Sequence, residues 1–144
     1  MSLPFVNENT DSRRRLESVV RRLSEEDMRR TTPYGWTVSA LLAHLAFWDQ
    51  RVLVLLRRWK EKGVDESPMD SDAMNGALRP LCHAVEPRQA IDLCLSSAKS
   101  VDAELETVTP ELFESIRSSP THFRFSRALH RNDHLNDIET LLSG

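Results

Sequence analysis

Apolar residues recur at intervals of three and four along most of the chain, which is the spacing of amphipathic helices. The clearest stripe follows Thr37, a residue able to cap a helix, and comprises Leu41, Leu45, Trp48, Val52, Leu55 and Trp59. We expect this helix to end at about Lys62, just before Gly63. It is the strongest helical pattern in the sequence.

Three further stripes predict three more long helices. The first begins after Thr10 or Asp11 and buries Leu16, Val19, Val20 and Leu23. Another starts at Pro87, which suits a first helical position, and its inner face comprises Ala90, Leu93, Cys94, Ser97, Val101 and Leu105. The last helix carries His130, His134, Ile138 and Leu141 at steps of four, four and three.

The segments between these stripes predict the connections. We expect residues 24–34 to form a connection with a turn of helix. Residues 63–86 contain two prolines and two glycines, so they form a long connection with a short helix at about 73–78. Thr109 and Pro110 open a short extra helix before the last one. The prediction is an all-α fold, a four-helix bundle that forms one domain over residues 1–144.

The composition narrows the function. Only four glycines in 144 residues argue against a sheet protein, and 40% apolar with 28% charged residues is typical of a globular chain. A net charge of −3 creates no field that draws the protein to nucleic acid or an anionic membrane. We interpret the arginine runs as solvated helix faces. With no export signal and no membrane-spanning run, we expect a cytoplasmic protein whose Cys82 and Cys94 are reduced and mostly buried.

The histidines are the candidate chemistry. His130 and His134 lie four residues apart on one helical face, where they either share a metal ion or each form an ordinary hydrogen bond. His44 lies at the edge of the apolar arc of its own helix and is the candidate third ligand. If the two helices run in the same direction, as in an up-and-down bundle, the three side chains lie at a similar level. His83 and His122 fall in or beside connections, so we expect them at the surface.

Three motifs in this order resemble the DinB/YfiT-like superfamily, whose members are regarded as metalloenzymes. These motifs are the histidine-bearing "GWTVSALLAHL", the connection "AMNGAL" with Asn75, and the "HRNDHLNDI" of the last helix. The resemblance implies that His44, His130 and His134 bind a divalent metal. Zinc or nickel is expected ahead of iron or manganese, although imidazole suits several of these ions and ligand type alone does not choose among them.

Three imidazoles leave a coordination position open, as in catalytic sites. By resemblance, the expected function is a thiol-dependent S-transferase or isomerase, or a hydrolase, that acts on a small electrophilic or toxic molecule with a low-molecular-weight thiol as partner. The alternative is a non-catalytic binding or stress-protection module, with or without metal. The resemblance also suggests a homodimer.

Four further residues are candidates for the surroundings of the metal. Asp133 and Asp137 each follow a histidine by three residues and are candidates to orient it, although a surface role is equally open. Trp48, one turn beyond His44, is either a core anchor or a wall of the pocket, and Asn75 either caps the short helix or reaches the pocket. Asp49 is excluded as a ligand because it points about 140° away from His44 around the helix.

Overall fold

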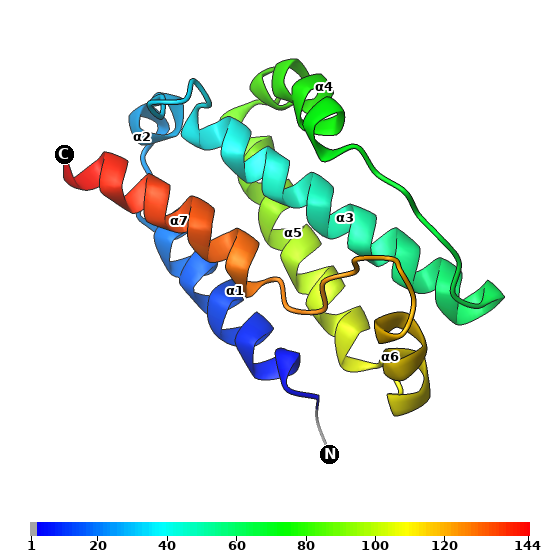
Figure 1. Ribbon diagram of the computed structural model, residues 1–144. Coiled ribbons are helices and arrows are strands. Elements are labelled where there is room, and N and C mark those ends of the chain that lie inside the picture. The colour runs from blue at the N-terminus through cyan, green and yellow to red at the C-terminus, as the bar shows by residue number, and fades with distance from the viewer. Residues whose placement is uncertain (1–2) are drawn as a thin grey trace.

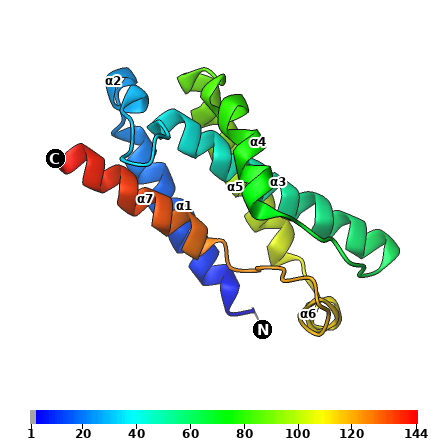
Figure 2. The same cartoon turned by 45° about the horizontal axis from the view of Figure 1, so that its top comes forward.

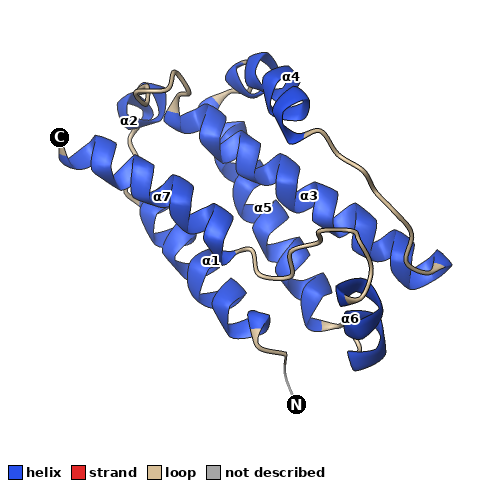
Figure 3. Ribbon diagram, viewed as in Figure 1, coloured by secondary structure: helices blue, strands red, loops and turns tan. Residues whose placement is uncertain are grey.

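The computed structural model describes residues 3–144, and its regular elements are all helices (Figures 1 and 3). They are α1 (Phe5–Arg21), α2 (Glu25–Arg29), α3 (Val38–Lys62), α4 (Ser71–His83), α5 (Pro87–Glu106), α6 (Pro110–Arg117) and α7 (Ala128–Ser143). Over these residues the all-α prediction is confirmed. The four long helices α1, α3, α5 and α7 pack in contacting pairs, α3 with α5, α1 with α7, α1 with α5, and α3 with α7.

The central helix α3 has the predicted bounds. The Thr37 hydroxyl accepts a hydrogen bond from the Ala40 backbone N–H at 3.0 Å, and Gly63 ends the helix with a positive φ of 86°. Residues 38–46 are buried without interruption. By length and composition α3 is the one described helix that can cross a membrane. However, 72% of its most apolar stretch of 18 residues is buried inside the protein. Its apolar surface is therefore already covered by the neighbouring helices.

The helices α3 and α7 run in opposite directions, which corrects the expected up-and-down order. His44 lies against His130 and His134, whereas Asp49, further along α3, pairs with Arg127 at the start of α7. By contrast, α3 and α5 run in the same direction, as the pairs Gln50 with Ser97 and Lys60 with Glu104 show. Figure 1 shows both relationships.

The long connection explains this topology. After α3 the chain returns along it through α4, and the His83 ring at the end of α4 accepts the backbone N–H of Thr37 at 3.3 Å (Figures 1 and 2). Pro87 therefore begins α5 near the start of α3. The histidines still converge, because α7 begins beside the middle of α3 and runs back past His44.

Two helices are longer than their patterns predicted. The first begins at Phe5 and not after Thr10, because the buried Phe5 ring stacks on Phe113 and Phe125 at 5.9 and 5.1 Å. The helix expected at about 73–78 extends over Ser71–His83 and includes Pro80. The starts of α5 at Pro87 and of α6 at Pro110 are as predicted.

A network of buried charges joins the long helices just beyond the histidines. Arg131 of α7, with 1% of its surface exposed, donates to Asp102 of α5 at 2.8 and 3.0 Å and to Asp49 of α3 at 3.3 Å. It also donates to the Asn9 carbonyl and the Ser12 hydroxyl of α1. The network thus fixes the position of α7, which carries two of the three histidines, relative to the other long helices.

Candidate metal centre

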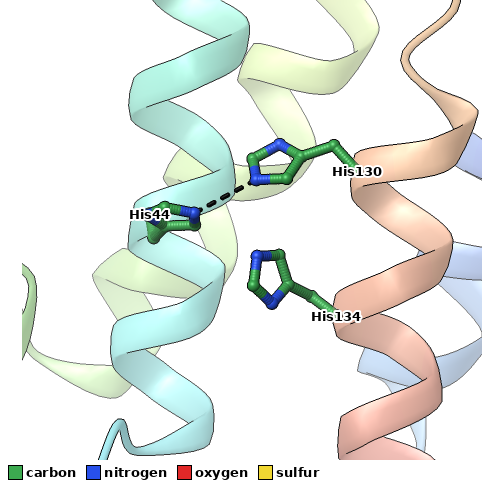
Figure 4. A group of neighbouring side chains, drawn as sticks. All are labelled: His44, His130 and His134. Atoms are coloured by element: carbon green, nitrogen blue, oxygen red, sulfur yellow. Dashed lines mark hydrogen bonds between the residues drawn. The ribbon is translucent and has the colours of Figure 1, made fainter. Parts of the chain in front are cut away.

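The structure brings His44, His130 and His134 together (Figure 4). The Nε2 atoms of His44 and His130 are 3.1 Å apart, and one nitrogen from each of the three rings lies within 4.8 Å of the others. The ring centroids are 4.9 to 5.0 Å apart, and the rings meet edge to face. Two nitrogens bound to one tetrahedral zinc ion lie roughly 3.4 Å apart, so the closest pair already has a suitable spacing.

Burial keeps the three imidazoles neutral, which is the form that binds metal. Burial, followed by the charge of His134, lowers the pKa of His44 from 6.5 to about 4. The same cause, followed by the charges of His134 and His44, lowers the pKa of His130 to about 2. Burial also lowers the pKa of His134, although Asp137 and Asp133 act in the opposite direction. Lone pairs are therefore available at neutral pH.

Two of the ring nitrogens lack the partner that a buried polar atom needs. The Nδ1 atoms of His44 and His134 are buried and have no hydrogen-bond partner among residues 3–144. An isolated polar nitrogen in this position is unfavourable by about 1–3 kcal/mol. The grouping of one nitrogen donor from each of three rings within 4.8 Å is what fits a divalent ion, whereas the two Nδ1 atoms lie on the rings without a partner among the described residues to orient them.

The carboxylates proposed to orient the histidines do not do so in this structure. Asp137 accepts a hydrogen bond from the Tyr34 hydroxyl at 2.7 Å, and Asp133 is exposed. In the described part of the chain, neither forms a hydrogen bond to a ring nitrogen of the three histidines. Their effect on the site is through charge alone, as the pKa of His134 shows.

Trp48 and Asn75 both lie at the site. The Trp48 indole N–H donates to Asn75 Oδ1 at 3.0 Å, and its ring meets that of His44 at 6.4 Å. Of the two roles left open for Asn75, capping does not occur, because Asp70 caps α4 by accepting from the Ala73 N–H. Since Asn75 Oδ1 is occupied by Trp48, its amide N–H₂ group is left to donate into the space beside the histidines.

Two cavities, each of about 300 Å³, share the histidine cluster. We call the first the arginine cavity; its lining includes His44, Trp48, Arg51, Asn75, Arg124 and His130. The second is the tyrosine cavity, lined among others by Tyr34, Trp36, His44, Asn75, His130 and His134. His44, His130 and Asn75 belong to both, so both cavities border the histidine cluster.

The sequence patterns missed three contributors to the site. Tyr34 and Trp36 lie in the connection before α3, and the Trp36 ring meets the His44 ring edge to face at 5.3 Å. Arg131 occupies the inner face of α7 together with Leu135 and Ile138, which places the histidines at the edge of that face. The spacing of Arg131, Leu135 and Ile138 at i, i+4 and i+7 is the signal that reveals this face.

The remaining candidates lie as the sequence indicated. His83 and His122 are exposed, although the His83 ring also packs against Trp36 and His122 borders the arginine cavity. Cys82 and Cys94 are free and buried. Asp49 points into the charge network and away from the histidines.

An all-helical protein with three histidines grouped across two helices is thus defined by the structure alone. Comparison with known protein families identifies its family, because residues 8–136 match the DinB superfamily. The match covers most of the chain, and the protein belongs to that superfamily. No curated protein and no solved structure matches the sequence significantly.

Proposed function

We propose that this DinB superfamily protein is a metal-dependent enzyme, built on a four-helix bundle, in which His44, His130 and His134 hold a divalent ion. The observation that carries the proposal is the grouping of three neutral imidazoles, whose ring nitrogens lie within 4.8 Å of one another. A divalent ion with an open position supplies Lewis-acid catalysis and lowers the pKa of a thiol or water that reaches it. Three imidazoles favour zinc or nickel.

We propose a thiol-dependent S-transferase or isomerase as the reaction class, with hydrolysis as the related alternative. The two cavities support this choice, because a transferase has to bring a thiol and an electrophile to one point from different directions. Neither cavity is filled by side chains, whereas a binding module without turnover requires no second approach to the cluster. The expected substrate is a small electrophilic molecule.

The surrounding residues have positioning roles in this proposal. Trp36 and Trp48 cover the His44 ring from two sides and limit the access of water to it. The Asn75 amide group, fixed by Trp48, donates a hydrogen bond to a polar atom of the bound substrate. The Tyr34 phenol stays protonated, because burial and the adjacent Asp137 raise its pKa, and its single O–H donates to Asp137.

The test is turnover by the purified protein. Low-molecular-weight thiols are incubated with a panel of small electrophiles, with the protein stripped of metal and then reloaded. We expect conjugation that appears on reloading and is lost in His134→Ala, while Arg57→Gln, which changes an exposed residue of α3 that lines neither cavity, keeps it. Absence of turnover across the panel by metal-loaded protein argues for the binding module. A cytoplasmic homodimer is part of the same proposal.

A further inference from the structure

The arginine cavity carries an excess of positive charge beside the histidine cluster. Its lining includes the guanidinium groups of Arg51, Arg124 and Arg127, and Asp133 is the acidic residue among the described lining residues. Only Arg127 is neutralised within the protein, since it donates to the buried Asp49 at 2.9 Å. The other two positive charges therefore face the cavity without a matching carboxylate.

Arg51 is held in place by neutral acceptors. Its Nη2 atom donates to the carbonyl and the hydroxyl of Ser67 at 3.2 and 2.9 Å, and no carboxylate of residues 3–144 pairs with it. Burial, followed by the charges of Arg58 and Arg127, lowers its pKa. Ser67 thus orients one edge of the Arg51 guanidinium. The positive charges of Arg58 and Arg127 nearby favour the binding of an anion there.

Arg124 lies across the cavity, in the segment that joins α6 to α7. Its side chain is exposed and makes no hydrogen bond or ion pair with the described part of the protein. A guanidinium that lines the cavity and has no partner in the described part of the protein is available to a ligand.

The rest of the cavity is suited to an apolar body. Trp48 and Val52 form one wall, and Phe123 and Leu129 contribute from the other side. Leu129 and Met69, at 57% and 46% exposure, are large apolar side chains left partly uncovered at this cavity. A volume of about 300 Å³ is at the lower end of the range for small-molecule sites.

We infer that the arginine cavity binds a small organic anion, with Arg51 and Arg124 holding a carboxylate or phosphate group and the apolar body lying between Trp48 and Phe123. The substrate class of the enzyme is then an amphiphilic anion whose reacting atom is directed to the histidine cluster. This last step rests on the proposed function. The binding of the anion by the two arginines does not depend on it.

The inference is tested by calorimetric titration of metal-loaded and metal-stripped protein. The probes are 4-phenylbutyrate and phenyl phosphate, with the neutral 4-phenylbutanamide as the uncharged counterpart. We expect at least one anion to bind both forms of the protein, and the amide to bind at least about tenfold more weakly. The stronger of the two anions identifies the group that the arginines prefer.

Variants assign the binding to the arginines. Arg51→Gln and Arg124→Gln are each expected to weaken the anion about tenfold, and Arg51→Lys, which keeps the charge but loses the planar fork, to weaken it less. The matched control is Arg57→Gln, an exposed arginine on the same helix with a 3.8 Å ion pair to Glu104, which should leave affinity unchanged. Unchanged circular dichroism spectra of the variants exclude misfolding as the cause.

The possible outcomes separate this inference from the proposed function. Equal affinity of the arginine variants and the unmodified protein overturns it, as does the failure of both anions to bind. Binding that is lost in His134→Ala but kept in the arginine variants also overturns it, because the anion is then a ligand of the metal. Binding that depends on the arginines in protein without any metal supports the anion site even if the proposed metal chemistry fails.

Discussion

Arg131, the residue that follows His130 in α7, forms a buried ion pair with Asp102 of α5 at 2.8 Å. The side chains of both are at most 2% exposed, and Arg13 of α1 donates to the same carboxylate at 2.9 Å. The helix that carries two proposed ligands is therefore tied to the rest of the fold by charge as well as by apolar packing. Removal of either partner leaves the other with only part of its compensation, from Asp49 for Arg131 and from Arg13 for Asp102.

This pair gives the first prediction. Asp102→Ala leaves Arg131 with only part of its compensation and should lower the free energy of unfolding by about 3–5 kcal/mol. Urea denaturation followed by circular dichroism measures the change. The control is Glu139→Ala, which removes a half-exposed partner of Arg15 and should lower the stability by less than about 1 kcal/mol. Similar losses in the two variants would show that the buried network has no special weight.

A second prediction concerns pH and the metal-free protein. The ordinary pKa of a histidine is 6.5, and burial lowers the folded value to about 4 for His44 and about 2 for His130. Below about pH 6.5 these two histidines bind protons in the unfolded chain but not in the folded one. The stability that their burial in neutral form contributes above that pH is therefore lost as the pH falls toward the pKa values of the folded state. The urea midpoint of protein treated with a chelator should therefore be lower at about pH 5 than at about pH 7.5.

The matched variants for this prediction are His130→Gln and His122→Gln. The first removes a buried histidine with a lowered pKa and should flatten the dependence on pH, whereas the second removes an exposed one and should not. An identical pH dependence in all three proteins would mean that the cluster is accessible to water and free to protonate.

A third prediction concerns the attachment of α4 over the site. Gly35 has a φ of 90°, and its carbonyl accepts from Arg79 of α4 at 3.2 Å. A Cβ at this position would meet the Arg79 guanidinium, and a side chain there also strains the backbone. We expect Gly35→Ala to lower the free energy of unfolding by about 1–2 kcal/mol.

Gly76→Ala is the comparison for that variant. Gly76 lies within α4, and a Cβ there would have no heavy atom within 4 Å. This substitution should raise the stability by about 0.5–1 kcal/mol, because alanine favours the helix. If urea denaturation shows that the free energy of unfolding falls in Gly35→Ala and rises in Gly76→Ala, the result supports the described path of the chain into and out of α4. A loss of stability in Gly76→Ala would contradict it.

Much of the helical structure was predictable because its signals are local. Thr37 and Gly63 bound α3, and Pro87 and Pro110 begin α5 and α6, through caps and backbone geometry that depend on neighbouring residues only. The early start of α1 was not predictable in this way, because Phe5 packs against aromatic rings more than a hundred residues away. The helix predicted at about 73–78 is shorter than α4, which continues past Pro80. Proline has no backbone N–H to donate, but Pro80 is exposed, so water can satisfy the backbone carbonyl left without that donor.

In the candidate site, too, some features were predictable from local signals and others depend on distant parts of the chain. The helical stripe and the family resemblance together named the three histidines that the structure brings together. The direction of α7 depends on how distant segments pack, and no periodicity within one helix reports it, whereas the burial of Arg131 was signalled by its spacing from Leu135 and Ile138. The role of Asn75 stayed open because a cap and a pocket residue have the same local appearance, and only its contact with Trp48 distinguishes them.

The central claim is that three imidazoles from α3 and α7 hold one metal ion, and the metal content of protein purified without a metal-affinity tag tests it most directly. Elemental analysis should find about one equivalent of a divalent ion, such as zinc or nickel, per chain. That equivalent should be lost in both His44→Ala and His134→Ala and kept in His122→Ala. Folded protein that holds no metal after incubation with zinc or nickel, or a His134→Ala variant that retains a full equivalent, would contradict the account.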